Sequence, residues 1–376
     1  MKILVCSCLL TLSLILFLSA CTGTEGSTEI WFTQRDPEGH KIVALNPATR
    51  LQRTIVRLKP GEFLADASLS PDGRKILYVS YRAQNPEVWL ANSDGSNPTR
   101  VGLDFEEKGF IWLDNDRILF TGLKINWTAY PDDPFQWKVY DLRSRQVQPL
   151  IWKGLTIPPP DHLSRSHYQV YIRRIPEASL VEETSVVFYG HIEIENDVVQ
   201  VIMDVQVDPL QLPRGLGSPG SATADGRIIV FHGRGGINNN DVFVASDYGH
   251  SVRQLTSFRE SYGVSGIGQL AISPNGKWVI FQGSLGLPHT PNLPTGGQIV
   301  LVSTDGKTLK FLREDKGGIY GRLVWSADSR YVAICVVPQG ADPNNSSGEI
   351  HLIDIETGEI KQLTSDGWSK EVFDWR

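Results

Sequence analysis

The sequence predicts an all-β protein built from a repeated unit of antiparallel strands. Short apolar segments recur along most of the chain and are separated by tight turns rich in Asp, Asn, Gly and Ser. After Cys21, no stretch keeps the 3.6-residue apolar periodicity of an amphipathic helix. Similar segments return at multiples of roughly fifty residues, which indicates a repeat architecture.

Composition agrees with a globular protein and limits its partners. The chain has 376 residues, of which 41% are hydrophobic, and a formal net charge of −6. This balance excludes a wholly disordered polymer. Because there is no basic surplus, we expect no nucleic-acid partner. The chain has only four Cys, so we expect no disulfide framework.

Residues 1–20 have the pattern of a lipoprotein signal peptide. Lys2 supplies a positive start, residues 3–18 are almost entirely apolar, and Leu18-Ser19-Ala20-Cys21 resembles the bacterial lipobox. The resemblance implies that the preceding peptide is removed and that Cys21 carries the lipid, palmitate among its acyl chains. The alternative is an ordinary signal peptide followed by a chance Cys. Residues 21–27 then form a short polar tether.

Lipidation at Cys21 predicts a place in the cell envelope. Each buried methylene of an acyl chain contributes about 0.8 kcal/mol, so several chains on one residue hold a protein firmly at a bilayer. Thr22, and not Asp, follows Cys21. By resemblance to Gram-negative lipoproteins, this favours the outer membrane, facing the periplasm. In a Gram-positive host the same signal predicts the outer cell surface.

The first hairpin of the repeated unit joins two apolar strands through a tight turn. Residues 67–79, with Ser70-Pro71-Asp72-Gly73 at the turn, match residues 270–281 and 323–334. Residues 111–120 and 222–231 are looser copies. Asp, Asn and Gly tolerate the left-handed backbone that such turns use, so these residue types predict hairpins.

A second hairpin follows in each unit. It occupies residues 88–95, 242–249, 299–306 and 350–358, and a further strand comes after it, as at residues 252–256 and 360–364. Four strands joined by hairpins form the blade of a β-propeller. We therefore expect residues 28–376 to fold as one propeller.

The spacing of the innermost strands predicts the number of blades. These strands end near Leu69, Trp112, Thr223, Ile272 and Trp325, and the interval between the second and third of them fits about two units. We assign the missing copy an inner strand near residues 168–173 and further strands at 187–192 and 198–203. If residues 158–212 are an insertion, the count falls from seven four-stranded blades to six.

The two ends of the chain predict how the ring closes. Residues 371–376 read as the first strand of a blade, and residues 29–34 read as the second strand of a blade that lacks its first. Pairing the N- and C-terminal strands would cover both exposed edges. We expect this pairing to close the propeller.

The motif of the first complete unit resembles that of a known family. Ser70-Pro71-Asp72-Gly73, followed by Val88-Trp89-Leu90-Ala91-Asn92-Ser93-Asp94-Gly95-Ser96-Asn97-Pro98, is similar to the repeats of the TolB-like (WD-repeat-like) β-propeller family. The resemblance implies a periplasmic or surface propeller that binds proteins or peptides.

Long, dissimilar loops between the second and third strands indicate the binding face. They include residues 124–137, 233–240, 283–297 and 339–348, whereas the turns at the other face are short and uniform. Variable loops on a rigid scaffold commonly carry binding. We expect ligand contacts from four loop residues: Trp127, Tyr130, Phe135 and His289. The alternative is that the loop aromatics pack onto their own blade.

No catalytic residue, cofactor or metal site is expected. Prolyl-oligopeptidase relatives combine similar propellers with a hydrolase domain and a Gly-x-Ser-x-Gly elbow, and the sequence contains neither. His162 and His167 are too irregularly placed to predict a metal site, and Cys335 reads as a core residue. The alternative is a secreted carbohydrate-active enzyme, a glycosidase or lyase, with its site in the central funnel. That enzyme would need two funnel carboxylates roughly 5–9 Å apart.

Together these features predict a lipid-anchored, non-catalytic propeller scaffold. We expect a monomer that binds a protein or peptide partner in the cell envelope and associates with the membrane through Cys21.

Overall fold

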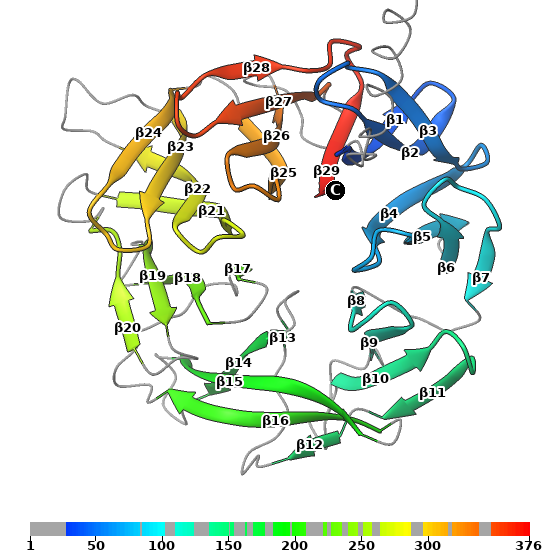
Figure 1. The fold of residues 1–376 in the computed structure, drawn as a ribbon, viewed down its shortest axis with the longest axis horizontal. Coiled ribbons are helices and arrows are strands. Elements are labelled where there is room, and N and C mark those ends of the chain that lie inside the picture. Colours follow the sequence, from blue (N-terminus) through cyan, green and yellow to red (C-terminus); the bar gives the residue numbers. More distant parts are fainter. Residues whose placement is uncertain are drawn as a thin grey trace, which may run out of the picture.

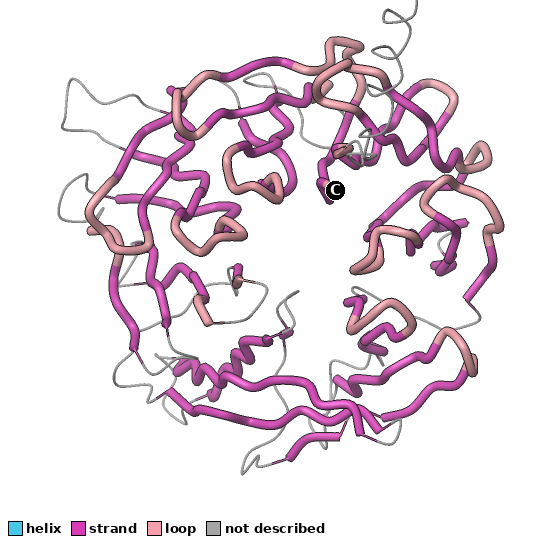
Figure 2. The backbone as a smooth tube through the Cα atoms, in the orientation of Figure 1, coloured by secondary structure: helices cyan, strands magenta, loops and turns pink. Residues whose placement is uncertain are grey.

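The computed structural model describes most of the chain after its first 27 residues. The described residues are 28–82, 85–101, 110–123, 135–149, 151–153, 162–163, 168–176, 183–195, 198–207, 221–223, 227–234, 240–246, 251–257, 264–286, 296–314, 318–337 and 347–376. They form strands and turns, and none of them is helical (Figure 2). The predicted signal peptide, Cys21 and the rest of the tether lie outside this set.

The described strands form seven sheets that follow one another around a common centre (Figure 1). Apart from a parallel pair in the five-stranded sheet, neighbouring strands are antiparallel. This arrangement follows from the alternation of apolar strands and tight turns in the sequence.

One sheet combines both ends of the chain. Its order is β29-β1-β2-β3, and its strands are β29 (Ser369–Trp375), β1 (Ile30–Asp36), β2 (Gly39–Leu45) and β3 (Gln52–Arg57). Ile30 pairs with Trp375 and Arg35 with Ser369, with a bulge beyond Trp31. The two terminal segments are therefore neighbours in one antiparallel sheet.

Five further sheets have four strands each. Two lie in the first half of the chain: β4 (Glu62–Leu69), β5 (Lys75–Arg82), β6 (Asn85–Asn92) and β7 (Thr99–Val101); then β8 (Phe110–Trp112), β9 (Arg117–Leu123), β10 (Phe135–Asp141) and β11 (Gln146–Pro149). Three lie in the second half: β17 (Ser221–Ala222), β18 (Ile229–Arg234), β19 (Asn240–Ser246) and β20 (Ser251–Gln254); β21 (Val264–Ile272), β22 (Trp278–Gly286), β23 (Gly296–Ser303) and β24 (Leu309–Glu314); and β25 (Gly318–Trp325), β26 (Tyr331–Val337), β27 (Glu349–Asp354) and β28 (Ile360–Gln362).

The diverged segment forms a sheet that differs from the prediction. Its order is β12-β16-β15-β14-β13, with β12 (Ile151–Lys153), β13 (His162–Leu163), β14 (Tyr168–Pro176), β15 (Glu183–Glu195) and β16 (Val198–Val207). Tyr168–Pro176 is thus not the innermost strand, because β13 lies inside it (Figure 1). The outermost strand, β12, comes from earlier in the chain and pairs parallel to β16, so it is not a hairpin continuation.

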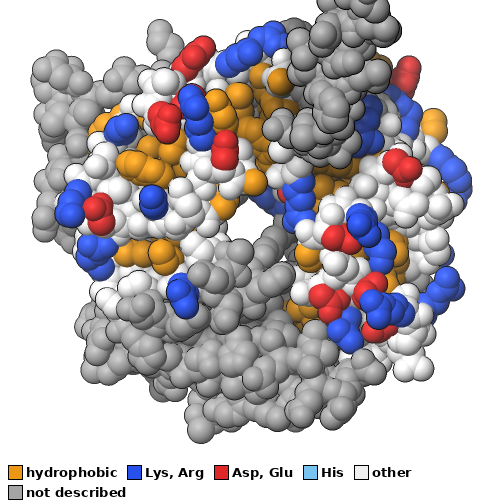
Figure 3. All heavy atoms as spheres, viewed as in Figure 1, with side chains coloured by type: hydrophobic (Ala, Val, Ile, Leu, Met, Phe, Trp, Pro, Cys, Tyr) orange, Lys and Arg blue, Asp and Glu red, His pale blue; other side chains and the backbone are white. Residues whose placement is uncertain are grey.

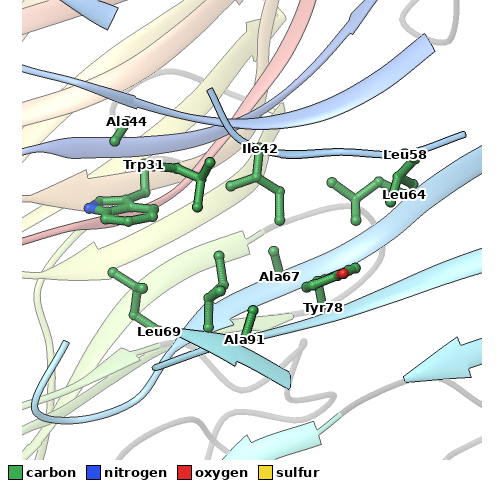
Figure 4. Packing of buried hydrophobic residues seen from close by; sticks show 11 residues of the cluster. Trp31, Ile42, Ala44, Leu58, Leu64, Ala67, Leu69, Tyr78 and Ala91 are labelled. Atoms are coloured by element: carbon green, nitrogen blue, oxygen red, sulfur yellow. The ribbon is translucent and has the colours of Figure 1, made fainter. Parts of the chain in front are cut away.

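The core lies between neighbouring sheets. Trp31, Ile42 and Ala44 of one sheet pack against Leu64, Ala67 and Leu69 of the next, as Figure 4 shows. Similar clusters join β17–β20 to β21–β24 and β21–β24 to β25–β28. Fully burying one such aliphatic side chain stabilises the fold by about 1.5–3 kcal/mol. Sheet-on-sheet packing therefore holds the ring together.

Repeated turns join the first and second strands. The Ser70 hydroxyl donates to the Asp72 carboxylate at 2.6 Å, and the Lys75 N–H donates to the same hydroxyl oxygen at 2.9 Å. Gly73 follows with a φ of 69°, in the left-handed region that glycine tolerates best. Ser273/Asn275 and Ser326/Asp328 repeat the hydroxyl bond between first and second strands, and Ser303/Asp305 repeats it between the third and fourth strands, β23 and β24.

The opposite end of each sheet carries the second-to-third strand connections and the links between sheets. We call it the loop end. In four sheets it is marked by the ends of the second strands, Asp36, Arg82, Gly286 and Val337. Sequence analysis placed the binding loops at this end.

Candidate binding surface at the loop end

The predicted contact residues fall mostly beyond what the structure describes. Trp127, Tyr130 and His289 lie outside the described residues, as does Cys21. Phe135 begins β10, where its backbone pairs with Leu123 of β9, but its side chain is outside the described part. The candidate site is therefore built from other residues of the loop end.

An aromatic cluster lies where two sheets meet at the loop end. Phe63 near the start of β4 pairs with Tyr81 near the end of β5. Their rings stack with centroids 4.8 Å apart and planes at 9°. The His40 ring, from β2 of the neighbouring sheet, lies 6.2 Å from the Phe63 ring at 56°. Phe63 remains 46% exposed, which is high for a large apolar side chain in a close aromatic contact.

A row of residues extends this cluster across the terminal sheet. Ser369 of β29 pairs with Arg35 of β1, and Arg35 pairs with His40 of β2. Trp368, which precedes Ser369, is 38% exposed. We call Arg35, His40, Phe63, Tyr81 and Trp368 the aromatic–arginine surface. Aromatic residues and Arg are the types most enriched where proteins bind partners.

A buried lysine fixes the link that presents Trp368. The Lys370 side chain is fully buried, and its ammonium donates to the backbone carbonyls of Gly348 and Trp368, each at 3.0 Å. It also pairs with the carboxylates of Glu349, at 3.2 Å, and Asp366. Four acceptors around one ammonium compensate the cost of its burial. Lys370 therefore ties the link before β29 to the start of β27.

Glu349 completes this attachment. One of its carboxylate oxygens accepts from the Thr364 hydroxyl at 2.5 Å, and the other accepts from the Gly367 N–H at 2.6 Å. The Thr364 hydroxyl oxygen in turn accepts from the Ile350 N–H at 2.9 Å. The segment between β28 and β29 is held at several points, so the backbone of Trp368 is already ordered. Binding through this residue would therefore cost little conformational entropy.

Charges beside the surface are mostly paired. Asp36 contacts Lys41 at 2.9 Å and Arg57 at 3.2 Å, and the Arg57 hydrogen bond holds the pKa of Asp36 well below its usual range. Burial lowers the pKa of His40 from 6.5, and the charge of Arg35 lowers it further. His40 is therefore uncharged at neutral pH and contributes an aromatic ring to the surface.

A second polar cluster lies at the centre of the ring, which is open on the face that Figure 3 presents. Arg322 of β25 contacts Asp66 of β4 at 3.1 Å although β29 lies between these strands, in contact with both. Arg376 contacts Asp374 at 3.2 Å. Burial raises the pKa of Asp374, and the charges of Arg376 and Arg322 oppose the shift. An arginine thus engages each of these two carboxylates.

Two observations concern metal binding and thiol chemistry in the part of the chain that the structure describes. The described residues include no group of three His, Cys, Asp or Glu residues placed to hold a metal ion. Cys335 is buried in β26, and burial raises the pKa of its thiol to about 12, so the reactive thiolate is scarce at neutral pH. Within the same described part, no helix is long and apolar enough to cross a membrane.

Sequence reasoning missed the aromatic–arginine surface because its residues come from four separated segments. Phe63 and Tyr81 looked like ordinary strand residues, and their exposure depends on the neighbouring sheet. One signal was available in the sequence. The predicted pairing of the chain ends brings the link that contains Trp368 beside Arg35.

Comparison with known proteins identifies the fold. No family model matches the sequence, and no curated protein matches it. Many solved structures resemble it, including the three that follow. TolB from Acinetobacter baumannii matches with a TM-score of 0.51 and 15% identity, over 93% of this chain and 66% of that chain. The β-propeller domain of the Trilobed protease from Pyrococcus furiosus matches with a TM-score of 0.59 and 17% identity, over 90% and 93%.

The third structure belongs to an enzyme. Oligogalacturonate lyase from Vibrio parahaemolyticus matches with a TM-score of 0.54 and 14% identity, over 90% of this chain and 86% of that chain. At such identities the likeness concerns the fold alone, and these neighbours include catalytic proteins. The chain has an all-β fold of the propeller type.

Proposed function

We propose that the protein is a non-catalytic propeller scaffold that binds a protein or peptide partner through the aromatic–arginine surface. The observation that carries this proposal is the exposure of Phe63, whose ring lies against His40, the register partner of Arg35, at rigid sheet ends. Exposed aromatic anchors near an arginine supply most of the affinity at typical protein interfaces. A glycoside-cleaving enzyme would use two carboxylates in the central funnel. In the central cluster Asp66 and Asp374 each contact an arginine, so these two carboxylates give that alternative no support.

We further propose that the seven sheets are the blades of one propeller that the pairing of β1 with β29 closes. The ring arrangement in Figure 1 supports this assignment. In such a ring the aromatic–arginine surface lies over the closing blade, so ligand binding and closure involve the same strands.

The proposal includes the cell envelope as the place of action. Lipidation at Cys21 would tether the propeller at a bilayer through the short segment 21–27. In cells that express the protein, metabolic labelling with alkyne-palmitate should label the wild type and leave Cys21→Ser unlabelled. An unlabelled wild type would contradict the anchor and leave the binding surface unaffected.

Site-specific photo-crosslinking in intact cells tests the binding role. A photoreactive amino acid at position 63 should give a covalent adduct with a partner. The same amino acid at position 51 is the control. Leu51 is 72% exposed in the turn between β2 and β3, at the end of the terminal sheet opposite the loop end. The absence of an adduct at position 63, whether or not one forms at position 51, would contradict the proposed surface.

A further inference from the structure

We propose that the ligand of the aromatic–arginine surface is an acidic peptide segment that carries an aromatic or other large apolar side chain. This inference rests on the proposed binding function and names the chemical class of the partner. It starts from the charge of Arg35, which is exposed and makes no ion pair with any residue of the described chain.

The cations nearest to Arg35 in the sheet are already neutralised. Lys41 pairs with Asp36 at 2.9 Å. Arg57 pairs with Asp36 at 3.2 Å and with Glu38 at 3.1 Å. Arg35 is therefore the cation of this group that remains available, on a protein whose formal net charge is −6. An exposed positive charge without an ion pair favours a partner that brings a carboxylate to that point, by local charge complementarity.

A second exposed arginine lies at the loop end of the neighbouring sheet. Arg82 ends β5, one residue after Tyr81, and is exposed without an ion pair to a described residue. Its register partner is Glu62, whose carboxylate accepts a hydrogen bond from the Lys59 N–H at 3.3 Å. Successive side chains of a strand point to opposite faces, so Arg82 and Glu62 lie on the other face of this sheet from Phe63 and Tyr81, and Arg35 is the arginine on the side of the rings. Guanidinium groups bind carboxylates through two parallel hydrogen bonds, which gives both strength and direction.

The dimensions of the surface fit an extended chain. From β29 to β2 it crosses two strand spacings of about 4.8 Å each. The ring separations from His40 to Phe63 and from Phe63 to Tyr81 add 6.2 Å and 4.8 Å. The path turns from one sheet to the next, so the surface spans less than the summed steps of roughly 20 Å and accommodates fewer than about six residues of extended peptide.

The stacking of the rings favours a peptide over an acidic oligosaccharide. Tyr81 covers one face of the Phe63 ring, and Phe63 covers one face of the Tyr81 ring. A pyranose packs flat against an open ring face, so this arrangement leaves fewer such faces for a sugar. A peptide side chain can instead insert beside the half-exposed Phe63 ring and be anchored there.

Selection from a random heptapeptide library tests the inference. The folded protein is immobilised, and Arg35→Glu and Arg74→Glu are screened in parallel. Arg74 is an exposed arginine in the turn at the opposite end of the neighbouring sheet, so it is the matched control. Wild type and Arg74→Glu should select peptides rich in Asp and Glu with one aromatic residue. Arg35→Glu should bind those peptides at least about tenfold more weakly, and more strongly when Lys replaces their acidic residues.

The outcomes separate the ligand class from the binding function. Selected peptides without acidic enrichment, or unchanged binding by Arg35→Glu, would overturn the acidic ligand and leave peptide binding in place. If no peptide is selected and the protein binds an oligogalacturonate probe, both the acidic-peptide inference and the proposed function are overturned. Circular dichroism of each variant verifies that the fold is retained.

Discussion

At the scale of single residues, a serine hydroxyl organises four of the described tight turns, those of Ser70, Ser273, Ser303 and Ser326. Ser303 donates to the Asp305 carboxylate at 2.6 Å and accepts from the Thr308 N–H at 2.9 Å. The same carboxylate accepts from the Lys307 N–H at 3.1 Å. These bonds lie within six consecutive residues, so local sequence is enough to predict them. This is why the turns could be located from the sequence before any strand pairing was known.

Removing the hydroxyl of such a turn should have a modest, measurable cost. Ser303→Ala leaves the Thr308 N–H without its acceptor, so the free energy of unfolding should fall by about 1 kcal/mol in urea denaturation. Ser365→Ala, at an exposed position in the link before β29, is the control and should change it by less than about 0.5 kcal/mol. Equal effects of the two substitutions would contradict the role assigned to the hydroxyl.

The same turn predicts a dependence of stability on pH. The Ser303 hydrogen bond, with backbone help from Lys307, lowers the pKa of Asp305 from 3.8 to about 2. A carboxylate whose folded pKa is depressed stabilises the fold above its unfolded pKa, and this stability is lost as the pH falls. The thermal midpoint of the wild type should therefore decline between about pH 4 and pH 2. Asp305→Asn should reduce that decline, and an identical pH profile for the variant would contradict the assignment.

At the scale of elements, connections between distant segments decide what sequence alone could not predict. β12 pairs parallel to β16, although more than forty residues lie between them, and no turn motif signals this pairing. The exposure of Phe63 depends on His40 in another sheet. Lys370 is buried among the acceptors of the β26–β27 and β28–β29 connections, although lysine is a residue type that usually lies exposed. Long-range packing, which local patterns do not encode, determines each of these features.

Lys370 should be among the residues most sensitive to substitution. Lys370→Met leaves the Glu349 and Asp366 carboxylates without their cation, so we expect a loss of about 3–5 kcal/mol in the free energy of unfolding. Lys361→Met, an exposed position on β28, is the control and should cost less than about 0.5 kcal/mol. Chemical denaturation measures both, and a loss below about 1 kcal/mol for Lys370→Met would contradict the account of the link.

At the scale of the whole molecule, the two terminal segments of the described chain pair within one sheet. The segments predicted to pair, residues 29–34 and 371–376, are the ones that β1 and β29 bring together. Arg376 also donates to the carbonyls of Ser70 and Pro71, in the turn of the following sheet. This pairing was predictable because each terminal segment reads as an apolar strand of an incomplete unit. The Arg322–Asp66 contact across β29 was not predictable, because it joins residues of two different sheets.

A disulfide between the terminal strands should test the closure. Thr33 and Glu371 are register partners, so Thr33→Cys combined with Glu371→Cys should form a disulfide on oxidation. Linking the chain ends should raise the thermal midpoint by restricting the unfolded state. Thr33→Cys combined with Lys361→Cys is the control and should remain reduced. A terminal pair that stays reduced in the folded protein would contradict the closing sheet.

The central claim is that the aromatic–arginine surface binds a peptide, and calorimetric titration tests it most directly. The peptide selected most strongly by the wild type is titrated into the wild type, Phe63→Ala and Leu51→Ala. We predict that Phe63→Ala weakens binding at least about tenfold, because the anchor is lost, and that Leu51→Ala leaves the dissociation constant unchanged. Equal dissociation constants for all three proteins would show that the peptide binds elsewhere and would contradict the account.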